Sequence, residues 1–277
     1  SSNAPISLSE GEILNLPIKP LLYRHNIQYV LALRYTLYKM TPSFLPDLLG
    51  DLSLEPLAAI KSMIRLVRNP THTHEVFTII KALSGSDLQK GLDRFKGTEF
   101  GEKVLRNRLQ LRDSLKKRNL LAKLPAGSLG REYQKFVQEE NLSADGLEKA
   151  NERSLQAEIT DPELKLFAAR QRDMHDLWHV VTGYGRDELG EACLLAFTYA
   201  QNKNRGVGFI AFVGCFKLFA NYRFNALKAI LQGYRIGREA AWLPEQDWES
   251  LLANQLNNVR EILNISLPSS YLASLNE

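Results

Sequence analysis

The sequence predicts an all-α fold, a single helical domain that holds a buried metal-binding helix pair. Apolar residues recur at helical spacing along most of the 277 residues, and no run shows the sustained apolar and polar alternation of a half-buried strand. No Asn-Gly or Asp-Gly pair lies between β-branched segments, where a hairpin would need it. We therefore expect an all-helical metal-binding domain over 55–277. A helical extension over 1–54 precedes it and is a candidate for contact with a membrane surface.

Prolines mark the limits of the expected helices, because proline disrupts a helix interior but is tolerated in the first turn. Pro42, Pro46 and Pro56 divide the early chain, and further prolines at positions 70, 125, 162, 244 and 268 separate the later segments. The periodic segments predict helices over 24–40, 56–69, 73–84, 99–121, 129–140, 162–182, 187–203, 207–235 and 245–264.

Composition is that of an ordinary globular protein, with 44% hydrophobic and 24% charged residues. The net charge of +4 is too small to indicate nucleic-acid binding. Both cysteines, Cys193 and Cys215, fall in apolar helical segments, which favours buried thiols in a reduced compartment over a disulfide framework. The first twenty residues carry Glu10 and Glu12 and no Arg, unlike a signal or transit peptide, so we expect a cytoplasmic protein.

The helix expected over 162–182 carries two histidines on its inward face. Asp161 is a good N-cap and Pro162 suits the first helical position. His175 and His179 are one turn apart, about 40° around the helix axis, and Asp176 lies about 100° from His175. The histidines continue a mostly apolar stripe, so they should point inward, where buried polar groups need partners.

A glycine turn should bring Glu191 back to these histidines. A continuous helix would carry Glu191 about 18 Å beyond His179 along the axis, out of reach. The sequence Thr-Gly-Tyr-Gly over 182–185 favours a turn instead, and Asp187 then caps a second, antiparallel helix. Two imidazoles and two carboxylates suit Zn²⁺, with Fe²⁺ or Mn²⁺ also possible. A zinc-protease site is disfavoured, since Asp176 stands where those enzymes need a glutamate as general base.

These residues resemble a known signature. His175, Asp176 and His179, followed after eleven residues by Glu191, are similar to the metal-site pattern of the Coq-four family of ubiquinone (coenzyme Q) biosynthesis proteins. Three further segments resemble the family: "LPAGSLGREYQKF" (124–136), "DPELKLFAARQRDMHDLWHV" (161–180) and "GREAAWL…WE" (237–249). The resemblance is strong over roughly 124–265 and weaker over 55–100.

The resemblance implies an all-helical protein whose zinc-site residues are His175, Asp176, His179 and Glu191. It implies action on a polyprenylated benzoate-ring intermediate, either as a scaffold for the biosynthetic enzymes or as an oxidative decarboxylase that replaces the carboxyl at ring carbon 1 by hydroxyl. The implied partners are an isoprenoid lipid, the membrane surface, other quinone-biosynthesis proteins and further copies of the chain. The best-known members are mitochondrial; without a transit peptide, we expect this chain to be bacterial and peripheral at the inner membrane face.

The run "VGFIAFVGCFKLFA" (207–220) is apolar except for Lys217, and fourteen residues are too few to span a bilayer. We interpret it as a core helix that could also line a groove for a prenyl chain. Gly208 and Gly214 leave room for close packing or for such a ligand. Lys217 is a candidate substrate-binding residue, as partner of a phosphate or carboxylate, or else its ammonium group reaches the surface.

The segment 103–123 carries eight basic residues and one acidic residue, a local charge of +7. Val104, Leu111 and Leu115 give it an apolar side, so a basic amphipathic helix at an anionic membrane surface competes with a solvated surface helix. No nucleic-acid-binding motif accompanies the charge.

The alternative function is a metal-dependent hydrolase of the HD-phosphohydrolase type. Such a hydrolase would need further ligands on other helices, and only His25, His72 and His74 remain to supply histidines.

Overall fold

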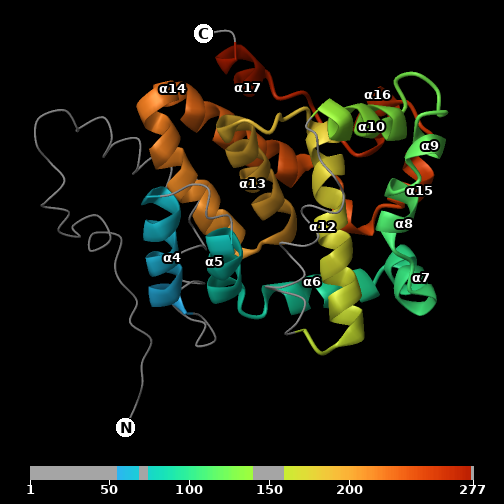
Figure 1. Cartoon of the computed structure of the whole chain (residues 1–277), viewed down its shortest axis with the longest axis horizontal. Coiled ribbons are helices and arrows are strands. Elements are labelled where there is room, and N and C mark those ends of the chain that lie inside the picture. The colour runs from blue at the N-terminus through green and yellow to red at the C-terminus, as the bar shows by residue number, and fades with distance from the viewer. Residues whose placement is uncertain (1–54, 69–73, 140–158, 276–277) are drawn as a thin grey trace, which may run out of the picture. The chain divides into compact units, whose positions relative to one another are not determined.

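The computed structural model describes residues 55–68, 74–139 and 159–275. Within these ranges the regular structure is helical (Figure 1). No strand occurs in them, only an isolated bridge between Ser128 and Gln255. The helices are α4 (Pro56–Arg68), α5 (His74–Ser84), α6 (Asp87–Lys96), α7 (Glu99–Asn107), α8 (Leu111–Leu115), α9 (Arg118–Leu121), α10 (Leu129–Glu139), α12 (Pro162–Thr182), α13 (Glu188–Asn202), α14 (Arg205–Glu239), the 3-10 helix η1 (Leu243–Glu245), α15 (Trp248–Leu251), α16 (Leu256–Ile262) and α17 (Ser269–Ser274).

The predicted all-α fold is confirmed. The helices expected over 56–69, 73–84, 129–140, 162–182, 187–203 and 207–235 correspond to α4, α5, α10, α12, α13 and α14. All described residues belong to one unit of the chain, Ser43–Glu277. The expected extension 1–54, with its helix over 24–40, lies outside the described residues.

The single helix expected over 99–121 is wrong, because the chain forms α7, α8 and α9 there. Arg108 adopts a left-handed backbone (φ 50°), and the N–H of Leu109 donates to the carbonyl of Val104, as at a helix C-terminus. Val104, Leu111 and Leu115 are all buried. The basic segment 103–123 is therefore not an amphipathic helix with an apolar face free for a membrane.

The helix expected over 245–264 is also interrupted, and α15 and α16 replace it. The carbonyls of Leu252 and Asn254, between the two, accept hydrogen bonds from the N–H groups of Gly130 and Leu129 at the start of α10. These carbonyls therefore accept hydrogen bonds from a neighbouring helix, and not from later N–H groups that would extend α15. Two further helices, α6 and α17, were not predicted, because each is short and mostly polar.

The pair α13 and α14 forms the largest packed contact, and Figure 1 shows the two helices as neighbours. Glycines make close approach possible: an added Cβ on Gly233 would lie 2.6 Å from the Cys193 carbonyl oxygen, and one on Gly208 would lie 2.8 Å from the Tyr199 ring. Close packing is thus confirmed at Gly208, whereas Gly214 meets only a methyl group of Ala192, at 3.8 Å.

The apolar run 207–220 lies in the first part of α14. Among the side chains of this run whose burial is described, five are buried, as expected of a core helix: Val207, Ile210, Ala211, Cys215 and Leu218. Further on, Arg223 has a non-helical backbone (φ 50°, ψ −132°), so α14 consists of two helical segments. At its start, Arg205 forms a buried ion pair with Asp87 of α6, at 3.0 Å. None of the described helices combines the length and the apolar character needed to cross a bilayer.

We predict opposite effects of alanine at two glycines of α14. An added Cβ at Gly237 would lie 2.6 Å from the Phe197 carbonyl oxygen, so Gly237→Ala should lower the free energy of unfolding by about 1–3 kcal/mol. The matched control, Gly214→Ala, should raise it by up to about 1 kcal/mol, because alanine favours helix and has room there. Urea unfolding measures both, and equal stability of the two variants would contradict this account of the packing.

Candidate metal centre

Helix α12 begins and ends as its sequence predicts. The Asp161 side chain accepts hydrogen bonds from the N–H groups of Glu163 and Leu164, and Pro162 opens the helix. At the other end Gly183 has a left-handed backbone (φ 79°), and its N–H donates to the carbonyl of His179. The helix therefore ends at Thr182, and the histidines lie on its last turns.

A tight reversal connects α12 to α13. Asp187 caps α13 by accepting from the N–H groups of Leu189 and Gly190. Gly190 approaches Gly185 so closely that an added Cβ would lie 2.2 Å from the Gly185 carbonyl oxygen. A side chain at position 190 would therefore force the turn open. The reversal places Glu191 on the first turn of α13, directed back at α12.

Residues from the C-terminal helices hold this reversal in place. The hydroxyl of Tyr271 on α17 accepts from the Gly185 N–H at 3.0 Å and donates to the Asp187 carboxylate. The Arg260 guanidinium on α16 donates to the carbonyls of Val181 and Val180, at 2.9 and 3.1 Å, near the end of α12. The turn is thus fixed by tertiary contacts as well as by its own sequence.

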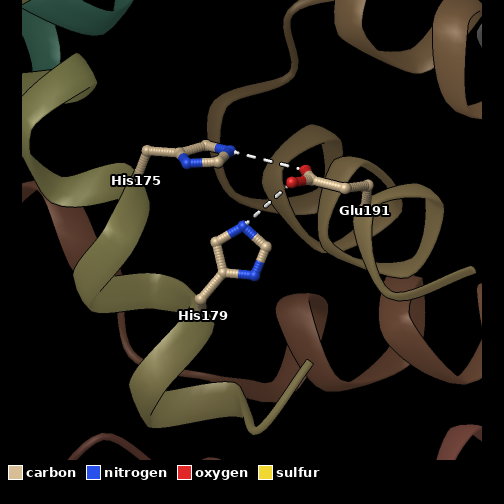
Figure 2. A group of neighbouring side chains, drawn as sticks. All are labelled: His175, His179 and Glu191. Atoms are coloured by element: carbon tan, nitrogen blue, oxygen red, sulfur yellow. Dashed lines mark ion pairs between the residues drawn. The ribbon is translucent and has the colours of Figure 1, made fainter. Parts of the chain in front are cut away.

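Three side chains converge between the two helices, as Figure 2 shows. The His175 Nε2 lies 3.9 Å from one carboxylate oxygen of Glu191, and the His179 Nε2 lies 3.5 Å from the other. All three ligand atoms lie within 4.8 Å of one another. The His179 side chain is 0% exposed, while His175 and Glu191 are 40% and 31% exposed. The group has a buried base and an accessible side.

The hydrogen bond of His179 Nδ1 determines which nitrogen of that ring carries the proton. His179 Nδ1 lies 2.9 Å from the carbonyl oxygen of Tyr184, which can only accept, so Nδ1 carries a proton and donates. The buried Nε2 of His179 has no hydrogen-bond partner among the described residues and faces the Glu191 carboxylate. Two acceptors that face each other require a cation between them, either a proton on the ring or a metal ion. The His175 Nε2, directed at the same carboxylate, favours the metal ion.

Asp176 lies beside this group instead of within it. Its Oδ1 is 3.4 Å from the His175 Nδ1, the ring nitrogen directed away from Glu191. Such a carboxylate behind a histidine orients the ring and raises its basicity as a ligand. The structure thus brings together three of the four predicted ligands, and a direct role of Asp176 as ligand stays a prediction.

Arg186 is a site residue that the sequence did not reveal. It lies in the turn, with Nη1 3.3 Å from Asp176 Oδ1 and Nε 3.7 Å from Glu191 Oε1. A cation in a turn follows no recognisable spacing; its only signal was its position between the glycines and Glu191. Arg186 is the positive charge that joins the two carboxylates of the site.

Both carboxylates are favoured in the charged form that a metal ligand needs. Burial raises the pKa of Glu191, but the approach of His179, His175 and Arg186 lowers it more, and the net pKa lies below the ordinary value. The pKa of Asp176 is likewise lowered: burial raises it, and the contacts with His175 and Arg186 outweigh that effect. Both groups are therefore ionised at neutral pH.

An aromatic ring packs against the ligand group, and an ion pair involves a neighbouring residue of α13. The Phe136 ring of α10 stacks on His179 with centroids 5.3 Å apart. Lys217 of α14 lies 2.6 Å from Glu188, which is one turn before Glu191 on α13. Lys217 is 42% exposed, so its ammonium group reaches the surface, and its contact with a substrate stays a prediction.

Within the described residues, His175, His179 and Glu191 form the one group of histidine, cysteine and carboxylate side chains able to share an ion. His25 and His72, which a hydrolase of the HD type would need as further ligands, lie outside the described residues. His74 is the first residue of α5.

Comparisons with known proteins relate this fold and site to one family. The model of the family described as "Coenzyme Q (ubiquinone) biosynthesis protein Coq4" matches residues 53–269. A mitochondrial COQ4 homolog of ubiquinone biosynthesis from Homo sapiens is 27% identical over 221 residues, 79% of this chain and 81% of that protein. The Danio rerio homolog is 27% identical over 164 residues, 59% of this chain, so the match spans little more than half of that protein, 57%.

A solved structure shows the same fold. A crystal structure of a Nostoc punctiforme protein assigned to ubiquinone biosynthesis superposes with a TM-score of 0.58 and covers 76% of this chain and 98% of that one. The sequence identity is 21%, so this likeness concerns the fold alone.

We predict that the Tyr271 hydroxyl supports the metal site from a distance. Tyr271→Phe removes the acceptor of the Gly185 N–H and the donor to Asp187, which should lower the free energy of unfolding by about 1–3 kcal/mol. It should also weaken divalent-metal binding, because the turn that positions Glu191 loosens. The control is Tyr234→Phe, since the Tyr234 hydroxyl makes no hydrogen bond to a residue that the structure describes. Thermal unfolding and metal titration measure both effects; equal behaviour of the two variants would refute the prediction.

Proposed function

Because the chain belongs to the Coq4 family of coenzyme Q biosynthesis proteins, we propose that it is a metal protein of quinone biosynthesis whose ion is held by His175, His179 and Glu191. The observation that carries this proposal is the fully buried Nε2 of His179, which faces a carboxylate and has no hydrogen-bond partner among the described residues. A buried acceptor in that position is costly without a cation beside it.

The donor set indicates which ions fit. Two neutral imidazoles and a carboxylate match Zn²⁺, and Fe²⁺ and Mn²⁺ accept the same ligands. The Tyr184 carbonyl and the Asp176 carboxylate hold the two rings from behind, as in established metal sites. Three protein ligands are the number found in catalytic zinc sites, which keep a position for water or substrate. When bound, the ion would polarise an oxygen atom of the substrate.

The substrate that we propose is a polyprenylated benzoate-ring intermediate, and the reaction is oxidative decarboxylation at ring carbon 1. The carboxyl group leaves as carbon dioxide, and an oxygen atom from molecular oxygen takes its place. For a ring with a para hydroxyl group, one molecule of oxygen accounts for the whole change and yields the quinone, carbon dioxide and water. The half-exposed His175 and Glu191 give the ring access to the site, while the buried His179, with the Phe136 ring stacked on it, forms its base.

Peripheral contact with a membrane is part of the proposal, and α4 is the element that supports it. Leu57, Ile60 and Ile64 lie on one side of this helix and are 73%, 48% and 47% exposed. Lys61 and Arg65 are exposed on the same helix. Exposed apolar side chains flanked by basic ones are typical of helices that lie at a lipid surface.

We predict that Glu191→Ala loses the metal. Removal of one of three ligands should weaken Zn²⁺ binding by more than about 100-fold, beyond the loss typical of residues that only support the ligands. The control, Glu188→Ala, removes the same charge one helical turn away and breaks only the pair with Lys217. Metal content after purification and titration with a zinc indicator measure the effect, and Zn²⁺ retained equally by both variants would exclude this site.

The activity test supplies a prenylated 4-hydroxybenzoate and ¹⁸O₂ to the metal-loaded protein. We expect loss of the carboxyl group and one labelled oxygen at the same carbon, detected by mass spectrometry. The product should be absent with Glu191→Ala and present with Glu188→Ala. Turnover that survives both Glu191→Ala and metal removal would contradict the metal-dependent reaction. Tight prenyl binding without turnover by the loaded protein would favour the scaffold role.

A further inference from the structure

Arg186 contacts both carboxylates of the metal site without belonging to the ligand group. Its Nη1 lies 3.3 Å from Asp176, and its Nε lies 3.7 Å from Glu191. Both separations are longer than those of a tight, two-bonded ion pair between arginine and a carboxylate. The guanidinium is close enough to balance the charge of the site, yet its hydrogen-bonding capacity is not used up by these partners.

Arg186 has further donors that none of the described residues uses. The Nη2 group makes no hydrogen bond to any residue within 55–68, 74–139 and 159–275, and the side chain is 23% exposed. Its side chain is partly exposed, as are those of His175 at 40% and Glu191 at 31%. A planar guanidinium in that place suits a carboxylate, which accepts two parallel hydrogen bonds.

The charge balance of the site points to the same ligand. With both imidazoles neutral, the charges of Asp176, Glu191 and Arg186 leave one net negative charge, which repels an anion and attracts a divalent cation. With a divalent cation held, the site carries one net positive charge, which suits a single carboxylate. Without Arg186, the loaded site would carry no net charge and would attract an anion less strongly.

We propose that Arg186 recognises the carboxylate of the substrate beside the metal and makes the site prefer a carboxylated ring to its decarboxylated product. This inference rests on the proposed function and names the residue that sets its specificity. The reaction removes the group that Arg186 binds. Product therefore loses the main polar attraction to the site, and the next substrate displaces it readily.

The experiment compares two ligands of equal prenyl length, a prenylated 4-hydroxybenzoate and the corresponding prenylated phenol, on the Zn²⁺-loaded protein. The parent protein should bind the acid at least about tenfold more tightly than the phenol, the range of a charge-assisted hydrogen bond. Arg186→Gln should abolish most of this preference and leave phenol binding unchanged. Arg186→Lys, which keeps the charge but not the planar pair of donors, should retain part of it. Arg106→Gln is the control, because it removes an exposed arginine of α7 paired with Glu102.

Zn²⁺ titration separates recognition from a structural role. Arg186→Gln removes a positive charge next to the ion, so Zn²⁺ affinity should stay equal or rise several-fold. A merely structural arginine would instead lower the affinity for Zn²⁺ and for both ligands together, and that result would overturn the inference. An unchanged preference for the acid in Arg186→Gln, or in Arg186→Lys if the first variant does not fold, would overturn it as well. Failure of the parent protein to bind Zn²⁺ or either ligand would overturn the proposed function, and this inference with it.

Discussion

The reversal of the chain between Thr182 and Glu188 determines where every group of the metal site lies. Helix α12 supplies two imidazoles on successive turns, and they meet a carboxylate only because the next helix returns alongside them. The return is tight enough that Gly190 leaves no space for a side chain against Gly185. The same turn supplies the Tyr184 carbonyl that holds His179, and Arg186, which joins the two carboxylates. One backbone feature therefore fixes ligands, supporting groups and charge together.

The two histidines differ in burial and in the group that contacts the second nitrogen of each ring. His179 is fully buried, donates to a neutral carbonyl and stacks on Phe136, so its ring has little freedom to move. His175 is 40% exposed and is backed by the negative Asp176. A carboxylate behind an imidazole makes it a stronger electron donor than a carbonyl does. The buried histidine is the rigid member of the group, and the exposed one, with Glu191, forms its accessible side.

The sequence predicted this site because its signals are local. Asp161, Gly183 and Asp187 each cap a helix through bonds to residues at most four positions away, so the helix pair could be read without knowing the rest of the fold. The prediction of one continuous helix through the segment 103–123 was wrong for the opposite reason. Val104, Leu111 and Leu115 are buried at helical spacing, but one long helix and three short ones bury the same positions. Arg186 was missed because its role depends on distances across the turn, for which no spacing rule exists.

The hydrogen bonds of Tyr271 and Arg260 have a consequence for how the site comes into being. Tyr271 follows Asp187 by 84 residues, and Arg260 follows Val181 by 79, so the contacts that fix the turn are made by chain that leaves the ribosome much later than the ligands. An isolated peptide containing His175, His179 and Glu191 would therefore keep these side chains but lose the contacts that hold them close together. The contacts that fix the turn can form only after α16 and α17 have been made, so a newly made chain carries these three side chains unassembled until then.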